Sequence, residues 1–389
     1  MYRIGQEEID AVTDVIKQRC LFKINKSLEE TRNAEEELCE LFDAKHTLLM
    51  TSGHAALTSA LIALGVGPGD EVIVPAYTYI ATAMAVVAAG AIPVIADVDE
   101  TLTLDPIDTE RKVTKNTKCI IPVHIQGFPS NMDALCAIAE KHGLVIVEDA
   151  CQADGASYHG KRLGTIGDAG ALSFNYFKII TAGEGGAMLT NDKRVFERAL
   201  IYHDSSAVAF FGEQLKDVEE KLFCGNEYRT NEISSAILRI QLKRLDGIIA
   251  DLRKNKKIMM EKLSDVCTFI PSNDIEGDLG TTLAIRFDNK EKALAVAKDP
   301  GVKGTVPINT GKHVYTNWTP ILTKTGALNP LMDPFKMEAN KDIIPDYRLD
   351  MCEKTLDLLS RTVYVGVDPD WTEDQLNAKI ENIKAAIAK

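Results

Sequence analysis

The chain has 389 residues, long enough for two or three domains, and its 44 Lys and Arg against 57 Asp and Glu give a net charge of −13. That charge would be repelled by nucleic acids and anionic membranes, and no basic cluster offsets it locally. With 45% hydrophobic and 26% charged residues, the composition is that of a folded protein. No apolar run reaches the roughly 18 residues of a membrane-spanning helix. The polar, acidic N-terminus is unlike a secretory signal, so we expect a cytoplasmic protein.

The eight cysteines contain no C-x-x-C pair, and no His lies at metal-ligand spacing from two of them. We therefore expect reduced thiols, no disulfide framework and no metal site.

Two helices are predicted first, an amphipathic one over 6–19 and an acidic one over 27–42. In the first, Ile9, Val12, Val15 and Ile16 lie on one face.

From residue 46, short Val- and Ile-rich runs alternate with helical segments. The predicted strands are 46–50, 71–75, 92–96, 118–123 and 144–148, and the helices are 55–64, 78–89 and 132–142. Near-continuous apolar strands separated by helices indicate a parallel sheet covered on both faces.

Further along, strands at 171–174 and 186–190 flank a glycine-rich segment, and a helix starts at Lys193. The rest of the prediction is a long helix over 231–263, a strand at 282–287, a helix at 290–298, a strand at 303–308, a long loop and a last helix from Glu373. We interpret this as a large α/β domain, residues 1–250, and a smaller α+β domain, residues 251–389.

The first chemical feature is the turn from the strand 46–50 into the next helix. Free N–H groups at a helix start bind phosphate, and Gly53 lets the backbone approach closely. The alternative is a plain strand-to-helix connection.

Tyr77 and Tyr79 follow the second strand at its carboxyl end, where ligands of open α/β sheets sit. An aromatic side chain there stacks on a flat ring, or else is an ordinary core or lid tyrosine.

The third feature is at the end of the predicted strand 144–148, where Glu148 and Asp149 stand. A buried acid needs a cationic partner such as a protonated pyridine nitrogen, unless it is a helix cap or part of a structural salt bridge.

Lys178 stands between Phe-Asn-Tyr-Phe and Ile-Ile and precedes a glycine-rich turn. Desolvation lowers the pKa of a lysine and makes its amine a nucleophile. Ser173 offers a hydroxyl for an anion. One ligand accounts for the phosphate cradle, the ring stacker, the acid and the lysine together: pyridoxal 5'-phosphate.

These motifs resemble the DegT/DnrJ/EryC1/StrS family of sugar aminotransferases, which have the aspartate-aminotransferase type of fold. The resemblance covers nearly the whole chain and thins after about residue 280. The matching segments are 52–57, 67–75, 122–127, 148–152, 173–186 and Arg229 with the helix after it. It implies a pyridoxal phosphate fold of type I, with a mostly parallel seven-stranded sheet in the large domain. It also implies a homodimer with the active site at the subunit interface.

Residue by residue, the resemblance implies that Lys178 binds the cofactor covalently as a Schiff base. Asp149 pairs with the pyridinium nitrogen and Gln152 contacts the ring hydroxyl. Tyr79 stacks on the ring, with Tyr77 as the second candidate.

The resemblance also implies that Gly53, His54 and Ser173 bind the phosphate of the cofactor. His54 stands where the family usually has Thr, which leaves its backbone N–H for this contact. The family motif Gly-x-Asn-x-Arg reads 225–229 here, with Glu227 in place of the Asn that reaches the partner subunit's phosphate. A carboxylate beside a phosphate is repulsive, so either Asn226 or Arg229 would take over that contact.

The implied reaction moves an amino group from glutamate to an oxo-sugar. By overall likeness the sugar is 8-oxo-3,8-dideoxy-manno-octulosonate, which gives the 8-amino sugar for lipopolysaccharide. A nucleotide-linked keto sugar is the second candidate substrate. A sugar dehydratase is disfavoured, because that branch has His at the position of Lys178. A non-catalytic regulator and a scaffold without cofactor also stay open. His313, Tyr315 and Trp318, in the variable segment 308–318, either face a sugar or pack the loop.

Overall fold

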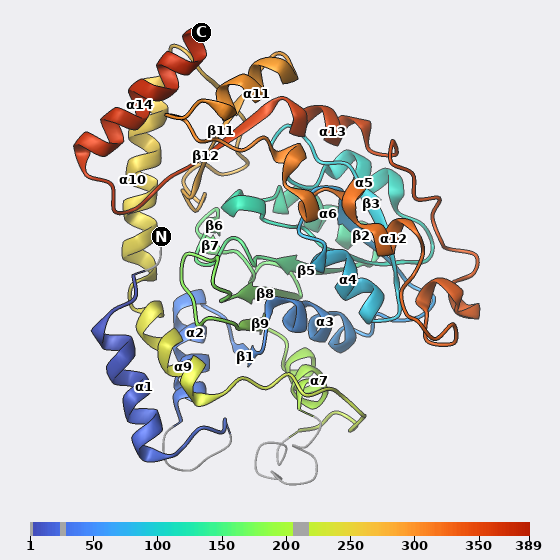
Figure 1. The fold of residues 1–389 in the computed structure, drawn as a ribbon. Helices are drawn as coiled ribbons and strands as arrows, with labels where there is room; N and C mark the ends of the chain where they lie inside the picture. Colours follow the sequence, from blue (N-terminus) through green and yellow to red (C-terminus); the bar gives the residue numbers. More distant parts are fainter. Residues whose placement is uncertain (1–2, 24–28, 205–217) are drawn as a thin grey trace.

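The computed structural model describes residues 3–23, 29–204 and 218–389 (Figure 1). In this part of the chain seven strands form one sheet, in the order β1-β9-β8-β5-β4-β2-β3. Their bounds are β1 (His46–Met50), β2 (Glu71–Pro75), β3 (Ile92–Ala96), β4 (Thr117–Ile120), β5 (Val145–Asp149), β8 (Ala169–Ser173) and β9 (Gly186–Thr190). All neighbours are parallel except the two pairs that β9 makes, with β1 and β8. The predicted mostly parallel seven-stranded sheet is confirmed.

Helices cover both faces of this sheet, as the apolar strands require. One face packs against α3 (Gly53–Ala63), α4 (Ala81–Ala88) and α7 (Lys193–His203). The other packs against α2 (Glu30–Phe42), α6 (Met132–His142) and α9 (Glu232–Leu242), and α5 (Pro106–Lys112) lies beside α6 and β3. Several of these helices begin at a side chain that caps the first turn, such as Ser52 for α3, Asp105 for α5 and Asn131 for α6.

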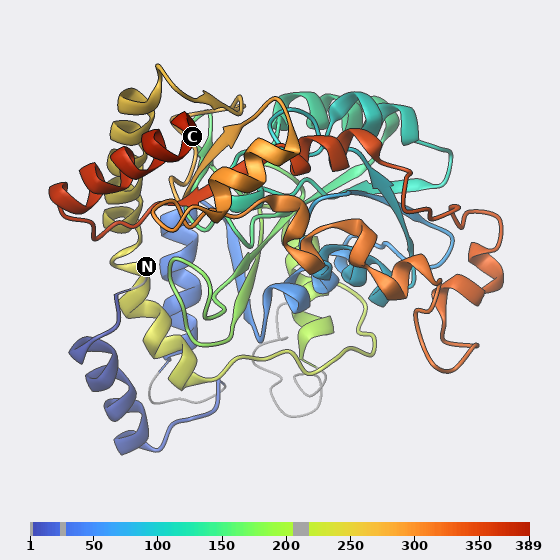
Figure 2. The ribbon, with the colours of Figure 1, turned by 45° about the horizontal axis from the view of Figure 1, so that its top comes forward.

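The C-terminal part is built around a second, antiparallel sheet in the order β10-β11-β12. Its elements are β10 (Thr268–Phe269), β11 (Thr282–Arg286) and β12 (Thr362–Gly366), with α10 (Leu245–Leu263), α11 (Lys290–Lys298) and α14 (Glu373–Ala388) packed together beside it (Figure 2). The remaining regular elements are the hairpin β6 (Ser157–Tyr158) and β7 (Lys161–Arg162), and the helices α12 (Thr319–Leu322) and α13 (Glu353–Ser360). The proposed boundary between 1–250 and 251–389 falls inside α10, which therefore belongs to both parts.

Two predicted elements are wrong. The helix predicted over 231–263 is broken into α9 and α10, because Gln241 and Arg244 at the break both bind the carbonyl of Arg3 and the carboxylate of Glu8. The strand predicted at 303–308 reduces to a single bridge between Thr305 and Tyr364, after which a short 3₁₀ turn begins.

The apolar face of the first helix is only partly buried. In α1 (Gln6–Gln18) the buried side chains are Glu8 and Val15, whereas Ile9 and Ile16 are 57% and 56% exposed. The ion pair of Glu8 with Arg244 turns this acidic position inward, and Ile9 and Ile16 are left on the outside.

Within residues 3–23, 29–204 and 218–389, no helix combines the length and the apolar character needed to cross a membrane.

Candidate active site

The predicted site residues meet at one edge of the large sheet. In the strand register Met50 lies opposite Gly186, Gly186 opposite Ser173, and Asp149 opposite Ala171. The carboxyl ends of β1, β5 and β8 therefore lie together. The turn into α3, the end of β5 and the loop that carries Lys178 all start from this edge.

The start of α3 is the phosphate end of the predicted site. Ser52 caps the helix by accepting a hydrogen bond from the N–H of Ala55, and the N–H groups of Gly53 and His54 precede any intrahelical acceptor. A Cβ atom at Gly53 would lie 2.6 Å from Cys151 Sγ and 3.0 Å from the Cβ of Ser173. A side chain at this position would therefore crowd Cys151 and Ser173, which favours glycine.

The side chain of His54 is engaged with the start of α4. Its Nδ1 lies 3.2 Å from the carbonyl of Ala81, at the start of α4, so this nitrogen carries the proton. Burial lowers the pKa of the imidazole, which keeps the ring neutral. The imidazole is thus engaged away from the first turn of α3.

Asp149 ends β5 as a buried carboxylate with two donors. Oδ2 accepts from Thr82 Oγ1 at 2.7 Å, and Oδ1 accepts from the N–H of Cys151 at 3.2 Å. A carboxylate offers about four acceptor positions, so Asp149 retains room for a cationic N–H.

Lys178 lies half-buried in the loop between β8 and β9, where its N–H donates to the carbonyl of Asn175. Its charge lowers the pKa values of Asp154, Cys151 and His313, so these three side chains lie within electrostatic range of it. Burial raises the pKa of Asp154 to about 8, and Asp154 Oδ1 accepts from the N–H of Ser173 at 3.4 Å.

The structure separates the two tyrosine candidates. Tyr79 is 43% exposed, and its ring centroid lies 5.4 Å from that of His313. Tyr77 is 1% exposed and packs in the core against Tyr364. Tyr77 is therefore a core residue, and Tyr79 is the aromatic side chain that is open to a ligand.

A segment from the C-terminal part closes this side of the site. Residues 76–80 pair with residues 312–315 through backbone hydrogen bonds. Tyr315 and Trp318 are fully buried, and both donate to backbone carbonyls. These two therefore pack the loop, and only His313 reaches toward Tyr79 and Lys178.

Gln152 is held by the loop that follows β4. Its Oε1 accepts from the backbone N–H of Gln126 at 3.0 Å.

Asn226 and Arg229 both have partners inside their own chain. The Asn226 amide donates to the Tyr202 hydroxyl at 2.6 Å. Arg229 forms ion pairs with Asp204 and with Glu227, so the carboxylate of Glu227 is balanced by a cation. The backbone of Arg229 lies beside Met50, at the end of β1.

Three neighbours of the site were missed by sequence reasoning: Thr82, Asp154 and Gln126. Asp154 stands in the same acidic segment as Asp149 and Gln152, which is a signal that the sequence offered. Thr82 and Gln126 give no such signal, because their roles depend on contacts with distant segments.

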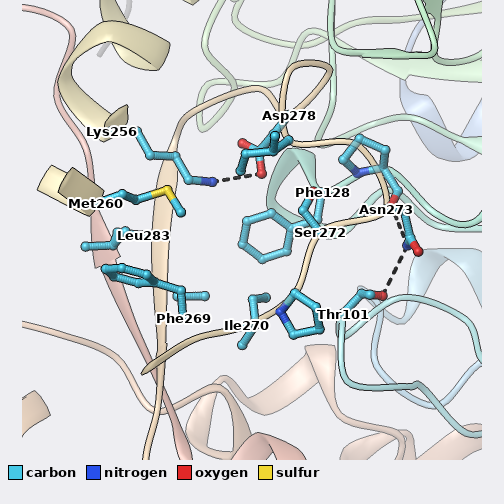
Figure 3. Close-up of a pocket in the computed structure, with 14 residues that line it drawn as sticks. Thr101, Phe128, Lys256, Met260, Phe269, Ile270, Ser272, Asn273, Asp278 and Leu283 are labelled. Atoms are coloured by element: carbon cyan, nitrogen blue, oxygen red, sulfur yellow. Dashed lines mark hydrogen bonds and ion pairs between the residues drawn. The ribbon is translucent and has the colours of Figure 1, made fainter. Parts of the chain in front are cut away.

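A separate pocket lies between the 127–130 loop, α10 and the 269–284 segment (Figure 3). Phe128, Met260 and Phe269 form part of its apolar wall, and Lys256 and Asp278 are paired at 2.8 Å on one side. It contains none of the predicted site residues. In the described part of the chain no three His, Cys, Asp or Glu side chains are grouped so as to hold a metal ion.

The chain is similar to known proteins in its sequence. The profile of the DegT/DnrJ/EryC1/StrS aminotransferase family matches residues 2–306. The chain is 40% identical over 248 residues to the dTDP-3-amino-3,4,6-trideoxy-alpha-D-glucose transaminase of Streptomyces venezuelae, with 63% of each chain covered. It is 38% identical over 262 residues to the spore coat polysaccharide biosynthesis protein SpsC of Bacillus subtilis, with 65% of this chain and 64% of the relative covered. Each match spans less than two thirds of the relative's length.

Among solved structures, that of 3-amino-5-hydroxybenzoic acid synthase is similar over 99% of this chain and 97% of the other. The TM-score is 0.80 and the sequence identity is 28%. This likeness confirms the predicted aspartate-aminotransferase type of fold. The profile match over residues 2–306 shows that the chain belongs to the DegT/DnrJ/EryC1/StrS aminotransferase family.

Proposed function

We propose that the chain is a pyridoxal phosphate-dependent aminotransferase that moves an amino group from glutamate to an oxo-sugar. The observation that carries this proposal is the convergence, at one edge of the sheet, of the helix start at Gly53, the buried Asp149, the exposed ring of Tyr79 and Lys178. These are the four groups that such a cofactor requires.

The residues fit the cofactor at both of its ends. At the phosphate end, the first N–H groups of α3 have no intrahelical acceptor, and the Ser173 hydroxyl has no partner in the described residues. At the ring end, Asp149 has two neutral donors and acceptor capacity left for a protonated ring nitrogen. These observations support our proposal that Gly53, His54 and Ser173 hold the phosphate and that Asp149 pairs with the ring nitrogen.

When bound, the cofactor supplies an electron sink for the bond that breaks at the Cα of the amino donor. Lys178 Nζ takes the proton from that Cα and returns a proton on the cofactor side, as general base and then general acid. Asp149 holds the proton on the ring nitrogen. Tyr79 orients the ring by stacking, and Gln152 binds the ring hydroxyl.

For the sugar, we propose 8-oxo-3,8-dideoxy-manno-octulosonate, on the overall resemblance of the chain to that branch of the family. The second candidate is a nucleotide-linked keto sugar, favoured by the name of the Streptomyces relative. The segment beside Tyr79, residues 311–318, lies beyond the family match at 2–306, so the relatives' substrates do not transfer directly. The exposed Lys312 of this segment suits either anionic sugar.

A homodimer is part of the proposal, with the active site at the subunit interface. Its support is the exposed aromatic side chain next to Lys178: Phe177 is 83% exposed, in a loop that starts from the site edge. Burying such a side chain against a second copy would remove an apolar surface from water. The mass of one chain is 42.6 kDa, and light scattering on the purified protein should give twice that mass.

The test is to incubate the purified protein with pyridoxal phosphate, glutamate and a panel of oxo-sugars that includes both candidates. We expect a cofactor absorbance, 2-oxoglutarate and an amino sugar. Lys178→Ala should lose both the absorbance of the covalently held cofactor and turnover, whereas Lys115→Ala, an exposed lysine between α5 and β4, should keep both.

A dehydratase, a regulator and a scaffold would each give a different result. A dehydratase would release a deoxygenated sugar that carries no amino group. A regulator or scaffold would show no cofactor absorbance. Full activity of Lys178→Ala would end the proposal.

A further inference from the structure

Gln126 has a left-handed backbone conformation next to the candidate site. It lies in the 3₁₀ turn η1 (Ile125–Gly127) with φ 54° and ψ 17°. For a residue with a side chain this conformation costs on the order of 1 kcal/mol and persists where the surroundings hold it.

Three hydrogen bonds hold Gln126. Its N–H donates to Gln152 Oε1 at 3.0 Å. Its carbonyl accepts from Thr281 Oγ1 at 2.8 Å, and its side-chain Oε1 accepts from Thr282 Oγ1 at 2.9 Å. Gln126 therefore connects Gln152, in the candidate active site, to the start of β11.

The first of these bonds fixes the orientation of the Gln152 amide. Because the backbone N–H of Gln126 is a donor, the atom of Gln152 that faces it must be the oxygen. The other atom, Nε2, then points elsewhere, and in the described residues it has no acceptor. Nε2 of Gln152 is therefore a donor that remains available to a ligand.

The β11 side of the linkage is itself anchored. The N–H of Leu279 donates to the carbonyl of Gly127 at 3.1 Å. Asp278 is almost fully buried, with Oδ2 paired to Lys256 Nζ at 2.8 Å and Oδ1 accepting from the N–H of Gly280 at 2.7 Å. Figure 3 shows Lys256 and Asp278 beside Phe128, whose ring centroid lies 5.1 Å from Lys256 Nζ. Contacts therefore run without interruption from α10 to Gln152.

We propose that Gln126 is a positioning residue. Its backbone N–H holds the Gln152 amide with Nε2 toward the ring hydroxyl of the cofactor, and its own side chain is held by Thr282. This rests on the proposed function. A donor at the ring oxygen stabilises its anionic form and so lowers the pKa of the covalently bound cofactor. We therefore expect the pKa of the bound cofactor to depend on Thr282, which binds Gln126 and acts on Gln152 only through it.

The first experiment titrates the visible absorbance of the holoenzyme against pH. Thr282→Val removes the hydroxyl that binds Gln126 but keeps the shape and suits the strand. We expect the midpoint to rise by about 0.3 to 1 pH unit, the size that corresponds to weakening one hydrogen bond. Thr282→Ser keeps the hydroxyl and should titrate like the wild type.

The second experiment follows amide hydrogen exchange of residues 124–130 in the protein without cofactor. Gln152→Ala removes the acceptor and should speed exchange of the Gln126 N–H. Gln152→Glu keeps an acceptor, so exchange should stay slow. In the holoenzyme, however, Gln152→Glu should raise the midpoint more than Thr282→Val, because it replaces a donor with an acceptor.

The two ideas fail differently. If the wild type shows cofactor absorbance and amino transfer but Thr282→Val and Gln152→Glu leave the midpoint unchanged, the positioning role is wrong and the proposed function stands. Unchanged exchange in Gln152→Ala would also overturn the positioning role. If the wild type binds no cofactor, the proposed function fails and this role fails with it.

Discussion

Thr82 Oγ1 lies 2.7 Å from Oδ2 of Asp149, so a side chain in the first turn of α4 donates to the carboxylate that ends β5. Oγ1 also lies 3.2 Å from the carbonyl of Tyr79, but a hydroxyl has one proton and the carboxylate is the closer and stronger acceptor. Thr78 Oγ1, 2.8 Å away, can donate to Thr82 in turn. The orientation of Asp149 is therefore set partly by α4.

Thr82→Val should weaken cofactor binding because Asp149 loses a donor and its orientation. Hydrogen bonds to charged groups contribute about 1.5–3 kcal/mol, so we expect an increase of about tenfold or more in the Kd for pyridoxal phosphate. Fluorescence titration of the protein without cofactor measures it. Thr82→Ser keeps the hydroxyl and serves as the control; equal affinities for the Val and Ser variants would contradict this role.

Gly53→Ala should disturb the phosphate end chiefly through its contact with Cys151. The new Cβ would lie 2.6 Å from Cys151 Sγ, and overpacking of this kind costs about 1–3 kcal/mol. We expect a lower melting temperature and weaker cofactor binding. Adding Cys151→Ala removes the sulfur and should restore much of both. If the double variant is no better than Gly53→Ala alone, the clash is not with Cys151.

Asp154→Asn should change how stability depends on pH. Burial raises the pKa of Asp154 to about 8 in the folded protein, whereas the pKa of an Asp in the unfolded chain is about 3.9. Between about pH 4 and pH 8 the folded state therefore binds more protons than the unfolded state, and this carboxyl makes the protein less stable as the pH rises through that window. The amide does not titrate, so the variant should gain melting temperature relative to the wild type from pH 5 to pH 8.5.

Calorimetry of the protein without cofactor tests this. Asp265→Asn makes the same substitution at an exposed position and should show a nearly constant difference from the wild type. A constant difference for Asp154→Asn as well would mean that Asp154 has an ordinary pKa.

Tyr79→Ala should raise the Kd for pyridoxal phosphate by about two- to tenfold, since aromatic pairs contribute about 0.5–1.5 kcal/mol. Tyr79→Phe keeps the ring and should bind like the wild type. The fluorescence titration described for Thr82 measures both. A Phe variant as weak as the Ala variant would show that the hydroxyl, and not the ring, makes the contact.

The sequence by itself determined the large sheet and the place of the chemistry. Val- and Ile-rich runs between helical segments predict parallel strands, and the residues that follow such strands collect at their carboxyl ends whatever the details of packing. Gly53, Asp149 and Lys178 were found in this way, each directly after a strand or in the turn between two strands.

Only the tertiary structure decided which side chains face that edge. Tyr77 and Tyr79 are two residues apart and equally aromatic, and pairing with residues 312–315 places one in the core and the other at the surface. Likewise, Gln126 acquires a role only because Thr281 and Thr282, some 155 residues later, bind it. The local sequence pattern gives the hydrophobic periodicity of a helix or strand and the residues where it ends. Which residues of distant segments contact it depends on how the whole chain packs.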